Sequence, residues 1–329
     1  MASIDDVVRE AVEDAVWAPS VHNTQPWRFS VRGSRISLRA DADRRLDVAD
    51  PDGREMLIGC GAALHNLRLS LRACGYEPVV RLLPDPERPH LLADVYVDVG
   101  AGPVDDEAVR DHAHIRRRRT HRGGFRPEPV PAGVQTALRY AAENEGARLV
   151  QAVDPHVKGA LAALTDAAEH VQRRTPAYAS EIARWAPAPK TARRDGVQHA
   201  AYPQQTPRTE PDFPPRDFAR GQGWGVEPAA GEGAALAGMV ALLVTREDSP
   251  EAWLHAGEAL QRLLLLADEH GLSAAFHTQA LEVPDLRAFI RTNFCGDDHP
   301  QMLLRIGVAE GERLATVRRP VEEVLIEEP

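Results

Sequence analysis

The chain has 329 residues, enough for two ordinary domains or one large one. Its formal net charge of −10, from 39 basic and 49 acidic residues, argues against a nucleic-acid partner or a polybasic membrane anchor. Hydrophobic residues make up 43% of the chain and charged residues 27%, which excludes an intrinsically disordered protein.

Periodic patterns over the first hundred residues predict an α+β unit. The first helix has Ser3 as its N-cap and stops before Pro19, and Gly75 follows a long second helix. Two alternating segments between these helices predict a β-hairpin. The predicted elements are a helix at 3–17, strands at 27–31 and 36–40, a helix at 54–74, and strands at 78–83 and 91–99.

The rest of the chain repeats part of this order. Ser249 begins another long helix, and Gly271 follows its end. The predicted elements are helices at 105–116, 132–145 and 155–172, a strand at 236–245, a helix at 249–270, a strand at 273–277, a helix at 284–293 and a strand at 301–308.

The two long helices match at an offset of 196 residues, which aligns Gly61 with Gly257. One interpretation is that amphipathic helices resemble one another. The other is an internal duplication, with two related halves packed as a pseudo-dimer. The paired glycines favour duplication, because glycine inside a helix costs about 1 kcal/mol unless another helix approaches closely. We therefore expect a first half at 1–103 and a second half at 104–329.

A segment between core elements, 185–233, is rich in proline and glycine and poor in aliphatic residues. A loop of this length in a compact protein is either a disordered linker or a lid. Its aromatic residues favour a lid, because a linker seldom carries so many. They are Trp185, Tyr202, Phe213, Phe218 and Trp224.

The cysteine content and the lack of long apolar runs predict a cytoplasmic protein. Three cysteines cannot form a disulfide framework, and Cys60 and Cys74 lie about 21 Å apart along one predicted helix. The N-terminal residues are polar and acidic, unlike a signal peptide, and no apolar run approaches the roughly 20 residues of a membrane helix. We expect neither a membrane nor a nucleic-acid partner.

Three polar segments carry residues suited to binding. The first, Ala18-Pro-Ser-Val-His-Asn-Thr-Gln-Pro-Trp-Arg-Phe29, is a tight loop between a predicted helix and a predicted strand. Such a loop can present hydroxyl, amide and backbone donors to a planar heterocycle. The alternative interpretation is a polar turn with an Asx cap.

The second segment, Ile115-Arg-Arg-Arg-Arg-Thr-His-Arg-Gly-Gly-Phe125, gathers guanidinium groups beside a hydroxyl and two glycines. Arginine binds phosphate oxygens through paired N–H donors, so this composition predicts a phosphate site. The alternatives are a solvated basic run and a nucleic-acid patch, and the acidic net charge disfavours the patch. The third segment, Val317-Arg-Arg-Pro-Val-Glu-Glu-Val324, adds an arginine pair that can close the same site.

These three segments resemble motifs of the nitroreductase superfamily of FMN-dependent oxidoreductases. The first resembles the family's flavin-contacting loop, Arg118-Arg-Thr-His-Arg122 resembles its Arg-Arg-Ser-x-Arg phosphate motif, and Arg318-Arg-Pro320 resembles its C-terminal basic-x-Pro element. The first two motifs stand in reversed order and the chain is longer than an ordinary nitroreductase. This pattern is similar to the Acg-like branch, in which two nitroreductase-like halves are fused. The resemblance implies an α+β nitroreductase-like fold whose halves form a pseudo-dimer, with a lid insertion.

The resemblance also implies one flavin site shared by the two halves. The first half lacks the phosphate motif at its start and the second lacks the Pro-Ser-x-x-Asn loop, so the other site is lost. The implied contacts are to FMN from Pro19, Ser20, Asn23 and Gln25, and to its phosphate and ribityl chain from Arg118, Arg119, Thr120 and Arg122. Arg318 or Arg319 is implied to contact the phosphate, and Gln279 and Ala280 are implied to stand near flavin N5.

No catalytic side chain and no metal are expected, because a flavin itself carries the redox chemistry. The resemblance implies an FMN-dependent NAD(P)H oxidoreductase that reduces nitro, quinone or related small-molecule electron acceptors. The alternative is a flavin-binding protein that sequesters or stores FMN under the lid, and a degenerate relative without flavin is a third interpretation. An intramolecular pseudo-dimer is compatible with a monomer.

Overall fold

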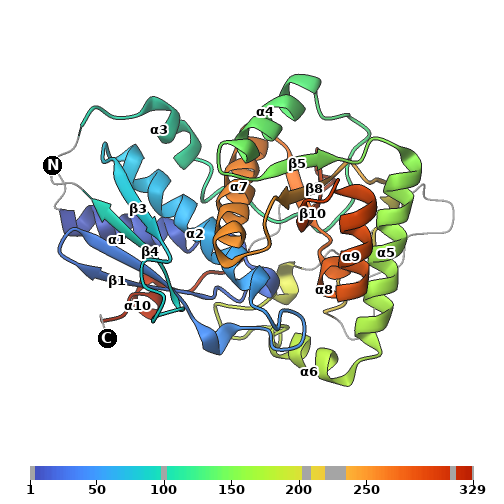
Figure 1. Ribbon diagram of the computed structural model, residues 1–329, viewed down its shortest axis with the longest axis horizontal. Helices are drawn as coiled ribbons and strands as arrows, with labels where there is room; N and C mark the ends of the chain where they lie inside the picture. Colours follow the sequence, from blue (N-terminus) through green and yellow to red (C-terminus); the bar gives the residue numbers. More distant parts are fainter. Residues whose placement is uncertain (1–3, 98–101, 202–208, 219–234, 312–315, 328–329) are drawn as a thin grey trace.

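Two antiparallel four-stranded sheets lie on either side of a pair of long helices (Figure 1). The computed structural model describes residues 4–97, 102–201, 209–218, 235–311 and 316–327. The first sheet has the order β1-β2-β4-β3 and the second β5-β8-β10-β9. Their strands are β1 (Trp27–Arg32), β2 (Arg35–Ala40), β3 (Pro78–Leu82), β4 (Leu91–Val97), β5 (Arg148–Gln151), β8 (Met239–Thr245), β9 (Ser273–Phe276) and β10 (His299–Gly307).

The helices come in the same order relative to the strands of each sheet. In the first half α1 precedes β1 and α2 joins β2 to β3, and in the second half α4 precedes β5 and α7 joins β8 to β9. The helices are α1 (Ile4–Ala15), α2 (Arg54–Ala73), α3 (Asp106–His112), α4 (Ala132–Glu143), α5 (Pro155–Arg173), α6 (Pro176–Arg184), α7 (Pro250–Glu269), α8 (Gln279–Glu282), α9 (Pro284–Phe294) and α10 (Val321–Val324), and a small parallel pair consists of β6 (Thr209–Glu210) and β7 (Ala235–Leu236).

The long helices α2 and α7 cross at their glycines. A Cβ atom on Gly61 would lie 2.1 Å from the carbonyl oxygen of Leu254, and one on Gly257 would lie 2.0 Å from that of Ile58. Ile58 and Leu254 are themselves 196 positions apart, so the contact is reciprocal. The prediction that each helix carries glycine because another helix approaches it is confirmed. Two related halves packed face to face produce this pattern.

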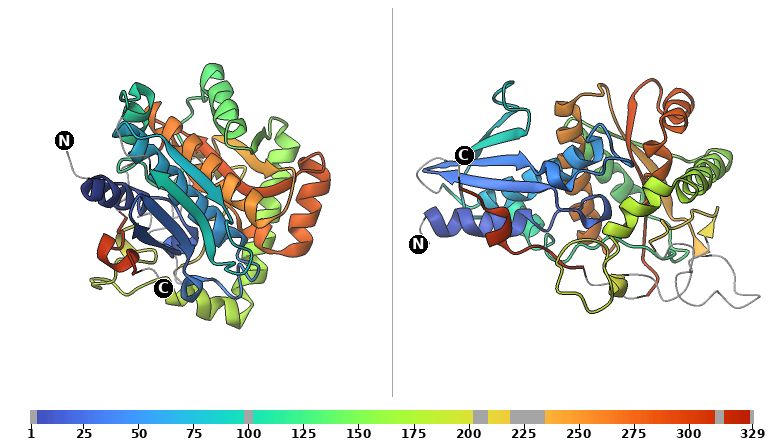
Figure 2. Two further views of the ribbon diagram at one scale, coloured as in Figure 1. Left: turned by 60° about the vertical axis from the view of Figure 1, so that its left-hand side comes forward. Right: turned by 90° about the horizontal axis from the view of Figure 1, so that it is seen from below.

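Each half has an apolar core of its own, except that the C-terminal segment packs into the core of the first half. One core lies between the first sheet, α1 and α2, and another between the second sheet, α4 and α7. Val321 and Val324 of α10 belong to the first core, and the Ile326 N–H donates to the Phe29 carbonyl. Figure 2 shows α10 beside α1. The C-terminal segment therefore returns to the first half, and the division at 103/104 remains a proposal.

The predicted elements agree with the structure except at a few positions. The predicted helix at 105–116 ends at His112, and the predicted strand at 236–245 is interrupted at Gly238, whose φ of 73° breaks it into β7 and β8. The strand β5 and the helices α6, α8 and α10 were not predicted, because each is short or lacks a clear apolar period. Among the described helices, none is long and apolar enough to cross a membrane.

Candidate functional site

A cavity of about 1150 Å³, counting its solvent-open mouth, lies where the two halves meet. Its walls come from the loop after α1, the first turns of α2, the segment after α3, the edge of the second sheet and the described part of segment 185–233. The lining residues are Pro19, Ser20, Val21, His22, Asn23, Glu55, Ile58, Gly59, Thr120, His121, Arg122, Val197, Phe213, Pro215, Arg216, Phe218, Leu260, Ala275, Phe276, His277, Thr278, Met302, Arg305, Thr316 and Arg318.

The loop after α1 is held tightly against α2. His22, Asn23 and Gln25 all have positive φ values, between 50° and 54°, and the Ser20 hydroxyl accepts a hydrogen bond from the Gln25 N–H at 2.9 Å. A Cβ atom on Gly59 would lie 3.3 Å from that of Ser20, so a glycine at this position of α2 lets the loop approach. This packing presents Pro19, Ser20 and Asn23 to the cavity.

Two buried arginines meet behind this loop. Arg118 is 3% exposed and Arg318 is 8% exposed, and both donate to the Trp17 carbonyl, at 3.0 and 3.2 Å. Arg318 also donates to the Asn23 side-chain oxygen at 3.0 Å. Arg318 and Arg122 line the cavity, whereas Arg118 lies behind its wall. The first loop and the two arginine segments are therefore assembled at one place.

Arg118 and Arg318 carry positive charge that no ion pair with a described carboxylate neutralises, although Asp268 attracts Arg118 from a distance. Among the described residues, the hydrogen bonds of Arg118 and Arg318 go to neutral oxygen atoms and to no carboxylate, and the Nε atom of each has no hydrogen-bond partner. Burial, together with Arg119 and Arg122, lowers the pKa of Arg118 to about 10, and burial with the same neighbours and Arg118 lowers the pKa of Arg318. A buried cation needs a counter-charge, so the cluster suits an anion such as phosphate.

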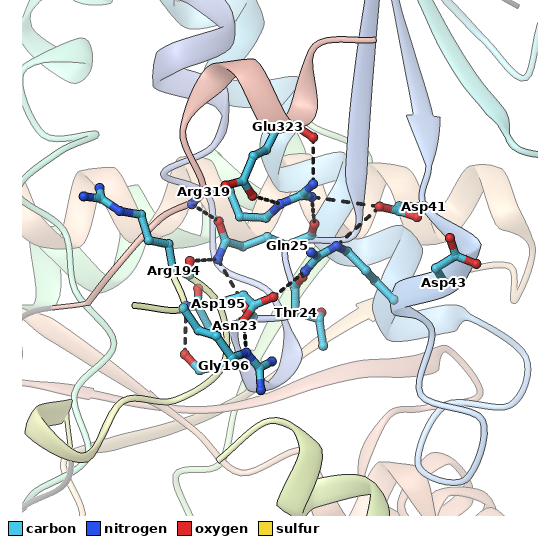
Figure 3. Close-up of polar contacts among 12 residues, drawn as sticks. Asn23, Thr24, Gln25, Asp41, Asp43, Arg194, Asp195, Gly196, Arg319 and Glu323 are labelled. Carbon is cyan, nitrogen blue, oxygen red and sulfur yellow. Dashed lines mark hydrogen bonds and ion pairs between the residues drawn. The ribbon is translucent and has the colours of Figure 1, made fainter. Parts of the chain in front are cut away.

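Gln25 and Arg319 connect three segments and do not line the cavity (Figure 3). The Gln25 side-chain oxygen accepts from the Arg319 N–H, and its amide donates to the Arg194 carbonyl, both at 2.8 Å. The Arg319 guanidinium donates to the Glu323 carbonyl at 2.7 Å. These residues hold the C-terminal segment and the start of segment 185–233 against the loop. Arg119 is also outside the lining and packs 4.8 Å over the Trp17 ring.

The edge of the second sheet forms the opposite wall. β9 is the last strand of that sheet, and the His121 N–H donates to the Ala274 carbonyl at 2.8 Å on its outer edge. Further along the strand, Phe276 and Thr278 line the cavity. Phe276 is two residues after Ala274, so its N–H and C=O groups point to the same outer edge, away from β10. Gln279 and Ala280 are buried in α8 behind this wall and do not line the cavity.

The described part of segment 185–233 covers one side of the cavity. Phe218 packs edge-on against His22 at 5.2 Å between ring centroids, and Phe213 lies 5.1 Å from His277. Arg216 binds Glu282 and also donates to the Tyr178 hydroxyl at 2.6 Å. By contrast, the buried Trp185 does not line the cavity, although it belongs to the same apolar cluster as Phe218. Tyr202 and Trp224 lie outside the described residues.

Some lining residues were missed by sequence reasoning. Arg305 is 1% exposed, and its Nε donates to His277 Nε2 at 2.8 Å. Burial lowers the pKa of Arg305 to about 10 and also lowers that of His277. A charged residue within the apolar run from Met302 to Ile306 of β10 was a usable signal. Among the described residues, no group of three or more His, Cys, Asp or Glu side chains could hold a metal ion.

The equivalent place in the second half is filled by its own side chains. The loop after α1 corresponds to the short turn between α4 and β5, where Glu145 forms ion pairs with Arg68 and Arg262, each at 3.0 Å. His255, 196 positions after Gly59, packs against Gly146 where the first half has room for its loop. The two halves are therefore related in fold and different in this site.

Comparison with known proteins identifies the family. The chain is 35% identical over 315 residues to a Mycobacterium tuberculosis protein named "Putative NAD(P)H nitroreductase". The matched region covers 92% of this chain and 86% of that relative. The chain belongs to the nitroreductase superfamily. It is also 30% identical over 322 residues to "Putative NAD(P)H nitroreductase acg" of the same organism, and this match covers 97% of the chain and 95% of the relative. No family model matches the chain.

Solved nitroreductases are similar over about two thirds of the chain. A nitroreductase with bound FMN from Bacteroides fragilis is 13% identical and covers 66% of this chain and 98% of its own, with a TM-score of 0.39. The FMN-dependent nitroreductase NfnB from Mycobacterium smegmatis, in complex with NADPH, is 17% identical and covers 68% and 100%, with a TM-score of 0.36. The family membership that the relatives show, together with the two four-stranded sheets around α2 and α7, confirms the expected α+β nitroreductase-like fold with two related halves.

Proposed function

We propose that this member of the nitroreductase superfamily is an FMN-dependent NAD(P)H oxidoreductase that reduces nitro, quinone or related acceptors. The observation that carries the proposal is the pair of buried guanidinium groups, Arg118 and Arg318, beside a cavity at the junction of the halves. Without a described carboxylate partner, they favour a bound anion, and the cavity has room for a planar ring system attached to it. The names of the relatives support NAD(P)H as the electron donor.

The residues present fit FMN at distinct parts of the cavity. Arg122, Arg318 and Thr120 would hold the phosphate from the lining, with Arg118 and Arg119 adding positive charge from behind it. The loop residues Pro19, Ser20 and Asn23 would contact the ribityl chain and the ring. Bound FMN would supply hydride transfer between the nicotinamide and the acceptor.

Four of the residues predicted from the sequence support the site from outside its lining in this proposal. Gln25 and Arg319 fix the loop and the C-terminal segment from outside the lining. The segment from Phe276 to Thr278 would offer backbone donors to the ring, and Gln279 and Ala280 would support it from α8.

A direct test uses the purified protein and its flavin spectrum. The protein should take up FMN, lose the oxidised flavin absorbance when NADH or NADPH is added without oxygen, and regain it with a quinone or a nitroarene. Failure to bind FMN would overturn the proposal. A matched measurement with riboflavin shows how much of the binding depends on the phosphate.

A second candidate is a protein that sequesters FMN with little reductase activity. The observation that favours it is the cover formed by Phe213, Arg216 and Phe218, which the Arg216–Glu282 ion pair holds against α8. Aromatic side chains over the cavity would compete with a nicotinamide for the face of the ring. In the same experiment, this function predicts tight FMN binding and negligible reduction by either nicotinamide.

A further inference from the structure

A cluster of five charged side chains forms around the first turn of α2 at the cavity. Arg54 and Glu55 belong to α2, Asp50 precedes it, Glu282 lies on α8, and Arg216 belongs to the covering segment. All five are buried or nearly so. The described cluster thus contains three carboxyl groups and two guanidinium groups, and an uncompensated negative charge is costly where water is excluded.

The hydrogen bonds show which carboxyl group is least stabilised as an anion. Glu282 receives the Arg216 guanidinium and the Gln172 amide, and Asp50 accepts the backbone N–H groups of Glu55 and Met56, at 3.0 and 2.8 Å. The Glu55 carboxyl receives one bond, from Arg54 Nη2 at 2.9 Å.

Arg54 does not fully compensate Glu55, because its other terminal nitrogen donates to the Gln301 carbonyl at 2.6 Å. Burial, Glu282 and Asp50 raise the pKa of Glu55 to about 8, against the opposing effect of Arg54 and Arg216. The surplus proton of the cluster therefore resides on Glu55 at neutral pH.

Glu55 also lies on the face of α2 that forms the cavity wall. Residues at i, i+3 and i+4 share one helix face, and Glu55, Ile58 and Gly59 all line the cavity. No other carboxyl group of the described residues lines it. The geometry joins a buried acid to the space where an acceptor would bind.

We propose that Glu55 donates the proton that the electron acceptor requires during its reduction. This inference rests on the proposed oxidoreductase function. A quinone that takes up one hydride from the reduced flavin and one proton from Glu55 becomes a hydroquinone. A nitro group that takes up the same hydride and proton becomes a nitroso group and releases water. The Glu55 carboxylate left behind regains a proton from solvent at the open mouth.

The test compares Glu55→Gln with Glu251→Gln as its matched control. Glu251 is the equivalent first-turn residue of α7, 196 positions later, and its side chain is 64% exposed. Reduction of bound FMN by NAD(P)H consumes no proton from the protein, so both variants should match the wild type in that half-reaction. Glu55→Gln should slow reoxidation by a quinone by about 100-fold, the scale of general acid catalysis. It should also abolish the loss of rate that we expect for the wild type as pH rises through about 8, the pKa of Glu55.

An infrared titration of the protein without flavin tests the acid independently of activity. The wild type and Glu251→Gln should show a protonated-carboxyl band that disappears above neutral pH, and Glu55→Gln should lack it. Asp50→Asn keeps an acceptor for the N–H groups at the start of α2 and removes a negative charge beside Glu55. In this variant the protonated-carboxyl band should therefore disappear at a lower pH than in the wild type.

Several results would overturn the proposal. One is a quinone half-reaction in Glu55→Gln with the wild-type rate and pH profile, even if the infrared band is lost. Another is a band that persists in Glu55→Gln, or that Asp50→Asn leaves unmoved. If neither the wild type nor any variant binds FMN, the proposed function fails and the donor role fails with it. If Glu55→Gln binds and reduces FMN normally and its quinone step is unchanged, only the role of Glu55 fails.

Discussion

Gly257 of α7 lies against the carbonyl oxygen of Ile58 in α2, closer than any larger residue would permit. Replacing Gly257 by Ala should lower the free energy of unfolding by at least 1–3 kcal/mol, about the cost of overpacking a core. Urea unfolding measures this change. Gly159→Ala is the control, because its added methyl group meets no atom within 4 Å in α5 and alanine favours helix there by about 1 kcal/mol. Equal effects of the two substitutions would contradict the close crossing.

We expect one FMN per chain. The loop that would build a second site is reduced to the α4–β5 turn, and the ion pairs of Glu145 with Arg68 and Arg262 fill the place. Flavin released by heat and quantified by absorbance should therefore be equimolar with protein. A ratio of two would show that the second half also binds flavin.

Arg318→Ala should weaken FMN binding far more than riboflavin binding, because only FMN carries the phosphate. A hydrogen bond to a charged group contributes about 1.5–3 kcal/mol, so we expect a loss of about 10-fold to 100-fold in affinity for FMN. Isothermal titration with both ligands measures it, and riboflavin serves as the internal control. Similar losses for both flavins would place Arg318 away from the phosphate.

Phe218→Ala should accelerate anaerobic reduction of bound FMN by NADPH several-fold without releasing the flavin. The Phe218 ring packs on His22 at the cavity. We expect it to restrict the entry of the nicotinamide, since covering side chains commonly gate access. Stopped-flow absorbance measures the rate, and Phe289→Ala, an exposed residue of α9, is the control. A slower reduction would instead mean that Phe218 builds the nicotinamide pocket.

The contribution of Glu55 to the free energy of unfolding should fall as pH rises from about 5 to above 8. Its pKa is raised from 4.5 to about 8 on folding, so the folded protein holds this proton more tightly than the unfolded chain. The stability that this proton confers is present at low pH and is lost as pH rises through the folded value. Urea unfolding at several pH values should give a steeper loss for the wild type than for Glu55→Gln. Parallel curves would show that Glu55 is ionised throughout.

Sequence reasoning found the parts of this protein whose signals are local. The paired glycines predicted the helix crossing, and the loop at Pro19–Asn23 and the segment at Thr120–Arg122 do meet at one cavity. The sequence could not show which side chains of a motif face inward. Arg118, Gln25 and Arg319 stand within the right segments and lie behind the lining, because the fold of each turn sets their direction.

Other features depend on residues far apart in the chain. The ion pair of Arg216 with Glu282 joins residues 66 positions apart, and the hydrogen bond between Arg305 and His277 depends on the local path of β10 and the turn after β9. Neither partner carries a pattern that indicates the other. The charge cluster around Glu55 likewise exists only after α2, α8 and the covering segment have packed together.

The return of the C-terminal segment to the first half has a consequence for biosynthesis. Val321 and Val324 fill part of the core around α1 and β1, and Arg318 reaches the loop that those elements support. During translation this core therefore stays incomplete until more than two hundred residues after β4 have been made. The cavity wall that Thr316 and Arg318 contribute can likewise form only after this segment has been made.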